Sequence, residues 1–176
     1  MELLERNISS ELKHAGHVVK MYHDQVELPN GKLANRDVVR HPGAVVIVPV
    51  LPDGSLVFVE QYRYPINQVL LELPAGKLDP NEDPAKCAER ELKEETGYHA
   101  QELSYLGKMV TTPGFCDEVI YMYKATVLTA SQATPDEDEF LNVKIIHHTD
   151  IGTLVQNGDL YDSKTITALF FAGYSI

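Results

Sequence analysis

Residues 76–98 carry a complete set of local signals for a loop followed by a helix. Asp83 is a residue type that caps helix N-termini, and Pro84 suits the first helical position, which needs no backbone donor. Gly97 tolerates the left-handed backbone in which helices often end. These signals predict a helix from about Ala85 to Thr96. A narrow apolar stripe on it could pack on a sheet: Ala85, Ala88 and Leu92.

Three glutamates lie on another side of this predicted helix. Glu91 and Glu95 are one turn apart, and like charges at that spacing cost about 0.2–0.5 kcal/mol. Glu94 and Glu95 lie in the last turn, where the helix dipole disfavours anions by about 0.3–1 kcal/mol each. A hard cation such as Mg²⁺ or Mn²⁺ would reverse these terms, because it prefers carboxylate oxygens. The spacing alone leaves two interpretations open, a solvated acidic face and a metal site.

The fixed residues of the segment follow one pattern, which is Gly76, Glu82, Arg90-Glu91-Leu92, Glu94-Glu95 and Gly97. This string resembles the Nudix box. Tyr98 is the one departure, since the family prefers a bulky aliphatic residue there. The resemblance implies a loop–helix–loop that binds a divalent metal and hydrolyses a nucleoside diphosphate linked to another group.

The resemblance also implies roles for single residues of the box. Glu91 and Glu95 match the main metal ligands, and Glu94 matches an accessory ligand or base. Arg90 and Glu82 match residues that brace the loop by pairing with each other. The first glycine of the box would provide a tight turn between strand and loop.

Three flanking segments are similar to the ADP-ribose pyrophosphatase and nucleoside-diphosphate-sugar hydrolase branch of the family: residues 60–63, 72–76 and 112–118. Pro113 follows the box at the spacing of that branch. The resemblance implies that the backbone carbonyl of Ala75 is a metal ligand, and a carbonyl oxygen is a suitable ligand for a hard cation.

Four residues are candidates for contact with the substrate. Arg63 is the expected phosphate contact, because a guanidinium matches phosphate oxygens and this acidic chain has few cations. The alternative for Arg63 is a surface ion pair on an edge strand. The resemblance implies that Arg36 or Arg40 reaches the nucleotide bound to the partner subunit of a dimer, and that Glu118 contacts the substrate across the same dimer.

The catalytic base is expected outside the metal ligands, because a carboxylate bound to cations accepts a proton poorly. The resemblance implies a glutamate just ahead of the predicted strand 141–147, and Glu139 is a better positional match than Glu137. An ordinary solvated acidic loop is the alternative there. If neither residue acts as the base, Glu94 is the next candidate.

Composition limits the function further. The chain has 176 residues and a formal net charge of −11, which argues against binding to nucleic acid or to an anionic membrane. Cys87 and Cys116 are its two cysteines, and they form no disulfide framework or zinc motif. The chain shows no apolar signal segment and no run long enough to span a bilayer, so we expect a cytoplasmic protein.

Hydrophobic patterning predicts an α+β fold, with strands and helices interspersed. A hairpin is expected over residues 16–40, around Pro29-Asn30-Gly31, and a strand buried on both faces over residues 44–51. The resemblance implies a Nudix α/β/α sandwich with a mixed sheet. We therefore expect a dimer-forming N-terminal hairpin region over residues 1–42 and a Nudix domain over residues 43–176.

Together these features predict metal-dependent hydrolysis of the pyrophosphate bond of ADP-ribose or a related nucleoside diphosphate sugar. The products would be a nucleoside monophosphate, AMP for ADP-ribose, and a sugar phosphate. Mg²⁺ is the expected cofactor, with Mn²⁺ as a substitute, and a homodimer is the expected assembly. Two alternatives are a Nudix hydrolase of another nucleotide sugar such as GDP-mannose and a non-catalytic module that senses nucleotide sugars.

Overall fold

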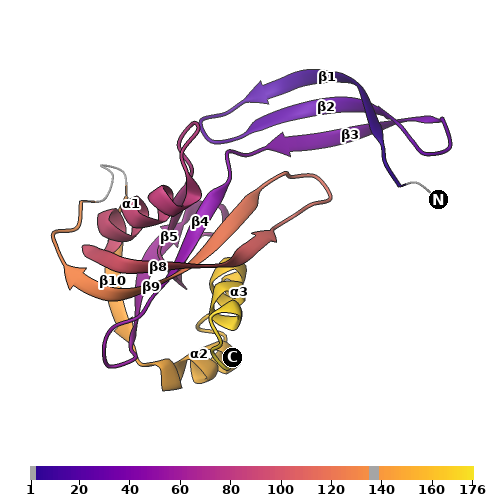
Figure 1. Cartoon of the computed structure of the whole chain (residues 1–176). Coiled ribbons are helices and arrows are strands. Elements are labelled where there is room, and N and C mark those ends of the chain that lie inside the picture. The colour runs from indigo at the N-terminus through magenta and orange to yellow at the C-terminus, as the bar shows by residue number, and fades with distance from the viewer. Residues whose placement is uncertain (1–2, 135–138) are drawn as a thin grey trace. The chain divides into compact units, whose positions relative to one another are not determined.

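The computed structural model describes residues 3–134 and 139–176. The chain divides into two compact units, one formed by Met1–Gly43 and Val110–Val119 and the other by Ala44–Met109 and Ile120–Ile176 (Figure 1). No helix of the described residues is long and apolar enough to cross a membrane.

The first unit contains an antiparallel three-stranded sheet in the order β1-β2-β3. Its strands are β1 (Arg6–Ala15), β2 (Lys20–Glu27) and β3 (Leu33–Arg40). The predicted hairpin is confirmed as β2 and β3, and Gly31 in its turn has a φ of 77°, which glycine adopts without strain. Strand β1 was not predicted, because all ten of its residues are exposed and no alternation of polar and apolar residues marks it.

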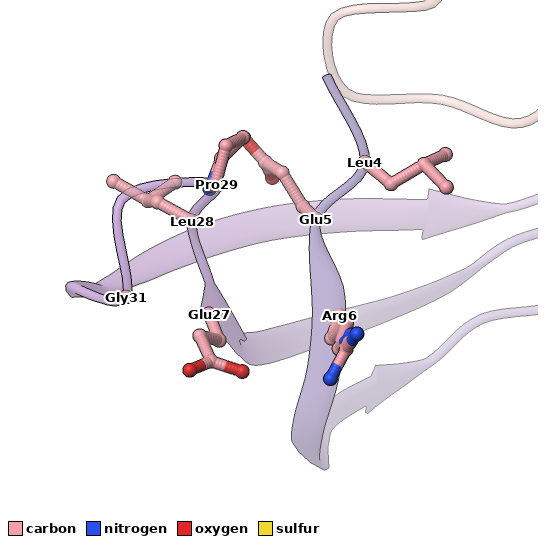
Figure 2. A pocket seen from close by; sticks show the side chains of 7 residues that line it. All are labelled: Leu4, Glu5, Arg6, Glu27, Leu28, Pro29 and Gly31. Carbon is pink, nitrogen blue, oxygen red and sulfur yellow. The ribbon is translucent and has the colours of Figure 1, made fainter. Parts of the chain in front are cut away.

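The segment 110–119 lies along β3 within this unit. Val39 N donates a hydrogen bond to Phe115 O over 2.7 Å, and Asp117 N donates to Val39 O over 3.1 Å. Elsewhere in the unit, an open cavity of about 450 Å³ lies between the start of β1 and the β2–β3 turn, beside Leu4 and Leu28 (Figure 2).

The described residues of the second unit form two sheets and three α-helices. One sheet has the order β10-β5-β6, and the other has the order β7-β4-β9-β8. The strands are β4 (Ala44–Pro49), β5 (Leu56–Arg63), β6 (Gln68–Glu72), β7 (Ala75–Lys77), β8 (Tyr98–Val110), β9 (Val119–Ala130) and β10 (Leu141–Ile146). The helices are α1 (Pro84–Thr96), α2 (Ile151–Asn157) and α3 (Ser163–Phe171), with short 3₁₀ turns at Tyr64–Ile66 and His148–Asp150.

Strand β4 explains how the helices are arranged around the sheet. It pairs in parallel with β9 and antiparallel with β7, so the sheet is mixed. All six of its residues are buried, as the continuous apolar run predicts. Val45 and Ile47 pack with α1, whereas Val46 and Val48 pack in a second core with residues of α2 and α3. Helices therefore cover opposite faces, and the predicted α/β/α sandwich is confirmed.

Candidate active site

Helix α1 begins and ends where its capping residues predict. The Asp83 carboxylate accepts hydrogen bonds from Ala85 N and Lys86 N over 2.9 and 3.3 Å. Gly97 ends the helix with a φ of 71°, and its N–H donates to Lys93 O. Ala88 and Leu92 have no exposed surface, because both pack against the sheet. The acidic side chains of the helix therefore stand on a rigid element.

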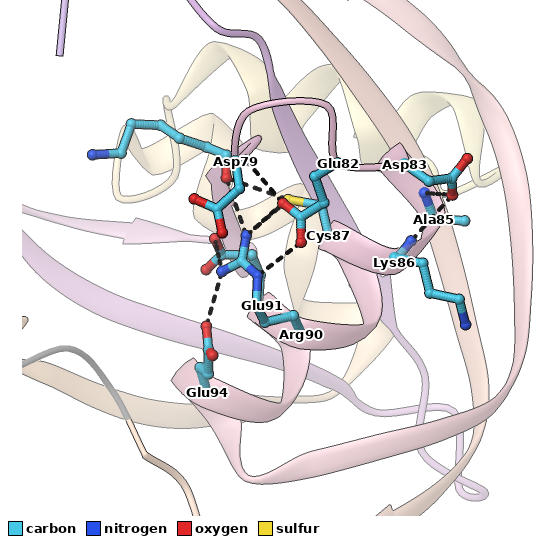
Figure 3. Close-up of polar contacts among 10 residues, drawn as sticks. Asp79, Glu82, Asp83, Ala85, Lys86, Cys87, Arg90, Glu91 and Glu94 are labelled. Atoms are coloured by element: carbon cyan, nitrogen blue, oxygen red, sulfur yellow. Dashed lines mark hydrogen bonds and ion pairs between the residues drawn. The ribbon is translucent and has the colours of Figure 1, made fainter.

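Arg90 is the centre of an ion-pair network on α1 (Figure 3). Its Nε and Nη2 donate to the two carboxylate oxygens of Glu82, each over 2.9 Å. Its Nη1 donates to Glu91 over 2.7 Å and to Glu94 over 3.0 Å. Glu82 also accepts from Asp79 N over 2.9 Å, and the hydrogen bonds from Arg90 lower the pKa of Glu82 to about 2. Arg90 and Glu82 therefore brace the loop, as the resemblance implied.

Glu91 and Glu95 are buried, with 8% and 3% of their surface exposed. The pKa of Glu91 is raised to about 7, chiefly by burial and less by the Glu94 and Glu139 carboxylates, although Arg90 lowers it. Burial and the neighbouring Glu91 raise the pKa of Glu95 well above its usual value, although Ala75 N donates a hydrogen bond of 3.1 Å to it. Burial and like charge thus destabilise the charged forms of both carboxylates, and a bound cation would stabilise these forms.

Gly76 lies beside Glu91, and its role differs from the expected one. It belongs to β7, where it pairs with Val45, and it does not have the positive φ of a glycine-dependent turn. A Cβ atom at this position would lie 1.8–2.3 Å from the carboxyl atoms of Glu91. The expected tight turn is therefore wrong, and glycine is required here because the carboxylate approaches the backbone closely.

Glu139 is close enough to the same carboxylates to raise the pKa values of Glu91 and Glu95. The chain before it is attached to the end of α1, because Thr134 N donates to Glu94 O over 3.0 Å and Ser131 N donates to the carbonyl of the helix-ending glycine over 2.6 Å. Glu137 lies outside the described residues. The negative charge of Glu139 therefore acts on the buried glutamates of the box.

The donor set of this cluster fits a divalent cation. Glu91 and Glu95 supply carboxylate oxygens from adjacent turns of one helix, and β7 runs beside them, with Ala75 N bonded to Glu95. Among residues 3–134 and 139–176, no three acidic, histidine or cysteine side chains are grouped closely enough to hold a metal by themselves. Arg90 accounts for part of this, because its guanidinium contacts Glu91 and Glu94. A bound metal ion would therefore displace the Arg90 guanidinium from these carboxylates, or it would take its remaining ligands from backbone carbonyls and water.

Arg63 lies at the end of β5 and is paired with Glu72 at the end of β6. Its Nε and Nη2 donate to the two oxygens of Glu72 over 2.8 and 2.7 Å. This pair is not the surface ion pair considered above, because Glu72 is 1% exposed. The positive charge of Arg63 also opposes the rise in the pKa of Glu95, so the two charged groups of the second unit influence each other.

The remaining sequence candidates lie in the first unit, where Arg36 and Arg40 have acidic partners and Glu118 is held by Thr111 and His41. Arg36 donates to Glu5 over 2.6 and 3.1 Å. Arg40 donates to Asp117 over 3.3 Å and to the buried Asp24 over 3.2 Å. Glu118 accepts from the Thr111 hydroxyl over 2.8 Å, and His41 Nδ1 lies 3.5 Å from it.

Sequence reasoning missed Asp24, Glu72 and Lys164, which hold candidate site residues or their partners. Each is a charged residue whose partners become neighbours only through strand pairing or helix docking. Two signals were usable, because Glu72 lies in the flanking segment 72–76 and Asp24 faces the same side of β2 as the buried Val26.

Comparison with known proteins places this constellation in a family. The model of the NUDIX domain matches residues 39–169. The chain is 42% identical over 167 residues to the methanol dehydrogenase activator of Bacillus methanolicus, covering 94% of this chain and 90% of that protein. It is 40% identical over 169 residues to the ADP-ribose pyrophosphatase of Bacillus subtilis, covering 95% of this chain and 91% of that protein.

A solved structure titled as an ADP compounds hydrolase has the same fold. It superposes with a TM-score of 0.83 at 24% sequence identity, covering 98% of this chain and 94% of that one. The chain therefore belongs to the NUDIX domain family, and it is a Nudix hydrolase. Membership of this family implies dependence on a divalent metal ion.

Proposed function

We propose that the chain hydrolyses the pyrophosphate bond of ADP-ribose or a related nucleoside diphosphate sugar. For ADP-ribose the products are AMP and ribose 5-phosphate. The observation that carries the proposal is the buried pair Glu91 and Glu95 on a capped helix, with Gly76 admitting the Glu91 carboxylate to the backbone. The ADP-ribose pyrophosphatase relative, which aligns over nearly the whole chain, supports this substrate class.

The proposed cofactor is Mg²⁺, with Mn²⁺ as a substitute. Bound to Glu91, Glu95 and the carbonyl of Ala75, with Glu94 as an accessory ligand, it would neutralise diphosphate charge and activate water. Arg90 and Glu82 hold the loop and the helix together, so the ligand oxygens are positioned before substrate binds. Positioning and electrostatics supply most of the rate enhancement in phosphoryl chemistry of this kind.

Glu139 is the proposed general base. Its supporting observation is that its charge raises the pKa values of Glu91 and Glu95, the two proposed metal ligands. In this proposal Glu139 approaches the attacking water when substrate is bound. Glu94 is the alternative base, although its carboxylate is paired with Arg90.

The proposed assembly is a homodimer formed through the N-terminal region 1–42, with the Nudix domain at 43–176 and the protein in the cytoplasm. All ten residues of β1 are exposed and β1 is an edge strand of its sheet, and the unpaired backbone groups of such an edge can pair with another chain. In this proposal Arg36 or Arg40 reaches the nucleotide of the partner subunit, and Glu118 contacts the substrate across the dimer. Arg63 binds the diphosphate.

A substrate panel with product identification tests the proposal. The purified chain with Mg²⁺ is incubated with ADP-ribose, GDP-mannose and a nucleoside triphosphate, and products are separated by ion-exchange chromatography. We expect AMP and ribose 5-phosphate in equal amounts, with slower turnover of GDP-mannose and little of the triphosphate. Glu95→Gln, purified identically, serves as the control for contaminating activity.

The panel also separates the alternatives. Preferred cleavage of GDP-mannose would show that the substrate is a nucleotide sugar other than ADP-ribose. Binding of nucleotide sugars without turnover would identify a sensing module, which the intact carboxylates of the box disfavour.

A second candidate function comes from the relative that activates a methanol dehydrogenase. That relative aligns over 94% of this chain, so an effect on an alcohol dehydrogenase is a specific alternative. Adding the purified chain and Mg²⁺ to a methanol dehydrogenase tests it. A rise in dehydrogenase rate that the Glu95→Gln control does not give would support this function and tie it to hydrolysis.

A further inference from the structure

A buried charge network outside the Nudix box joins three elements of the second unit. Glu72 at the end of β6 is 1% exposed and carries two cationic partners. Arg63, from β5, binds it with two hydrogen bonds, and Lys164, from the first turn of α3, donates a third. Lys164 also donates to Asp162 over 3.0 Å. The network thus pairs two carboxylates with two cations.

The two cations of the network are not equivalent. The Lys164 side chain is 15% exposed and touches both carboxylates, whereas that of Arg63 is 38% exposed. Lys164 is also fixed by its helix, because Asp162 caps α3 at Thr165 N and the Thr165 hydroxyl accepts from Leu73 N over 2.9 Å. Lys164 is therefore the resident partner of Glu72, and Arg63 is the partner that can leave.

This difference bears on how Arg63 could bind a phosphate. A guanidinium held by two hydrogen bonds to a buried carboxylate can leave only if that carboxylate stays compensated, because an unpaired buried charge is strongly destabilising. Lys164 already contacts Glu72 and needs no movement when Arg63 departs. Burial opposes the ionised form of Glu72, yet its two cationic partners keep its pKa below the usual value.

We infer that Lys164 is a positioning residue that allows Arg63 to exchange Glu72 for the diphosphate of the substrate. The inference rests on the proposed function, in which Arg63 binds the diphosphate. Without Lys164, Arg63 becomes the sole cation on Glu72 and is held there, so substrate binds more weakly. Chemistry at the metal site is unaffected once substrate is bound.

Steady-state hydrolysis of ADP-ribose by the purified full chain with Mg²⁺ tests this role. For Lys164→Gln we expect KM to rise about tenfold, equivalent to about 1.4 kcal/mol of binding, with kcat nearly unchanged. Lys164→Arg keeps the charge and should retain the wild-type KM. Lys144→Gln is the matched control, since it removes a lysine of β10 that pairs with Glu60 of the adjacent strand β5.

A double variant separates this role from a merely structural one. Glu72→Gln removes the charge that holds Arg63, so Lys164→Gln combined with Glu72→Gln should return KM towards the wild-type value. A structural defect would instead persist or worsen in the double variant, with kcat and the melting temperature falling together. A Lys164→Gln variant with unchanged KM, or a double variant as impaired as Lys164→Gln, overturns the inference.

Glu72→Gln alone decides the matter if Lys164→Gln does not fold. Release of Arg63 predicts a KM equal to or below that of the wild type. A tenfold increase would mean that Glu72 orients Arg63 for the substrate, which contradicts the exchange. Calorimetric binding of ADP-ribose in EDTA should show the same order of affinities. A wild-type chain that hydrolyses none of the panel substrates refutes the proposed function, whereas unchanged variants of an active chain refute only this inference.

Discussion

Gly76→Ala adds one methyl group at the point where the Glu91 carboxylate approaches the backbone of β7. The added Cβ would lie 1.8 Å from the carboxyl carbon of Glu91. Ordinary contacts between carbon atoms are about 3.5–4.0 Å, so the carboxylate must move by about 2 Å. The side chain of Glu91 is flexible at that end, and the backbone of β7 can keep its pairing with β4.

The expected effect is therefore large on activity and moderate on stability. A displacement of about 1 Å in a catalytic group can cost 10²-fold in rate, so we expect kcat to fall by at least about 10²-fold. Overpacking of this kind typically lowers the free energy of unfolding by about 1–3 kcal/mol, and loss of the 2.7 Å contact from Arg90 to Glu91 is included in that range. The Mg²⁺ concentration for half-maximal rate should rise as well.

Hydrolysis of ADP-ribose at varied Mg²⁺, with thermal melting followed by circular dichroism, measures these effects. Gly152→Ala in α2 is the control, because its new Cβ meets no atom closer than Ser175 O at 3.7 Å. Alanine there should leave kcat unchanged and raise stability by up to about 1 kcal/mol. A folded Gly76→Ala variant with wild-type kcat and Mg²⁺ dependence would refute the close-approach reasoning.

Four further predictions concern the same site and the assembly. EDTA should abolish hydrolysis and Mg²⁺ or Mn²⁺ should restore it, and Glu95→Gln should lose several orders of magnitude in kcat while its circular dichroism stays native; full activity in EDTA contradicts the metal mechanism. The pKa of Glu91 is raised to about 7 in the folded chain, so its protonated form stabilises the fold below about pH 4.5. This stabilisation, up to about 3 kcal/mol, is lost as pH rises through 7. The melting temperature in EDTA should therefore fall between pH 5 and 8, and a rise would contradict this sign. Glu139→Gln should lower kcat by about 10²–10⁴-fold with little change in KM or metal affinity, and Glu137→Gln should do much less; if both are harmless, the base lies in the box. Size-exclusion chromatography should show a homodimer, and deletion of residues 1–40 should give monomers or aggregates with little affinity for ADP-ribose; a fully active monomeric truncation would contradict the dimer.

Local signals in the sequence were sufficient for the elements that carry the box. Helix α1 was predictable because Asp83, Pro84 and Gly97 act on their own immediate backbone. Strand β4 was predictable because burial on both faces makes its apolar run continuous. The start of β8 directly after the helix, at Tyr98, was not predictable, because its first half shows no regular alternation of buried and exposed residues.

The supporting contacts of the site could not be predicted from the sequence, because they join distant parts of the chain. Glu72 and Lys164 are separated by 92 residues and meet only when α3 docks on β6. The need for glycine at position 76 arises in the same way, since the carboxylate of Glu91 reaches it only after α1 packs beside β7. Motif spacing identified the chemistry, whereas tertiary packing determines which partners hold each charged group.

The Arg90 network has a consequence for how the protein endures shortage of its metal. Its guanidinium contacts Glu82, Glu91 and Glu94, so part of the negative charge on α1 is neutralised from within the chain. Removal of a divalent ion therefore leaves these carboxylates paired instead of mutually repelling, and the helix keeps its packing on the sheet. A chain that has lost its divalent ion would therefore stay folded but inactive, and turnover would resume when the ion returns, without new synthesis.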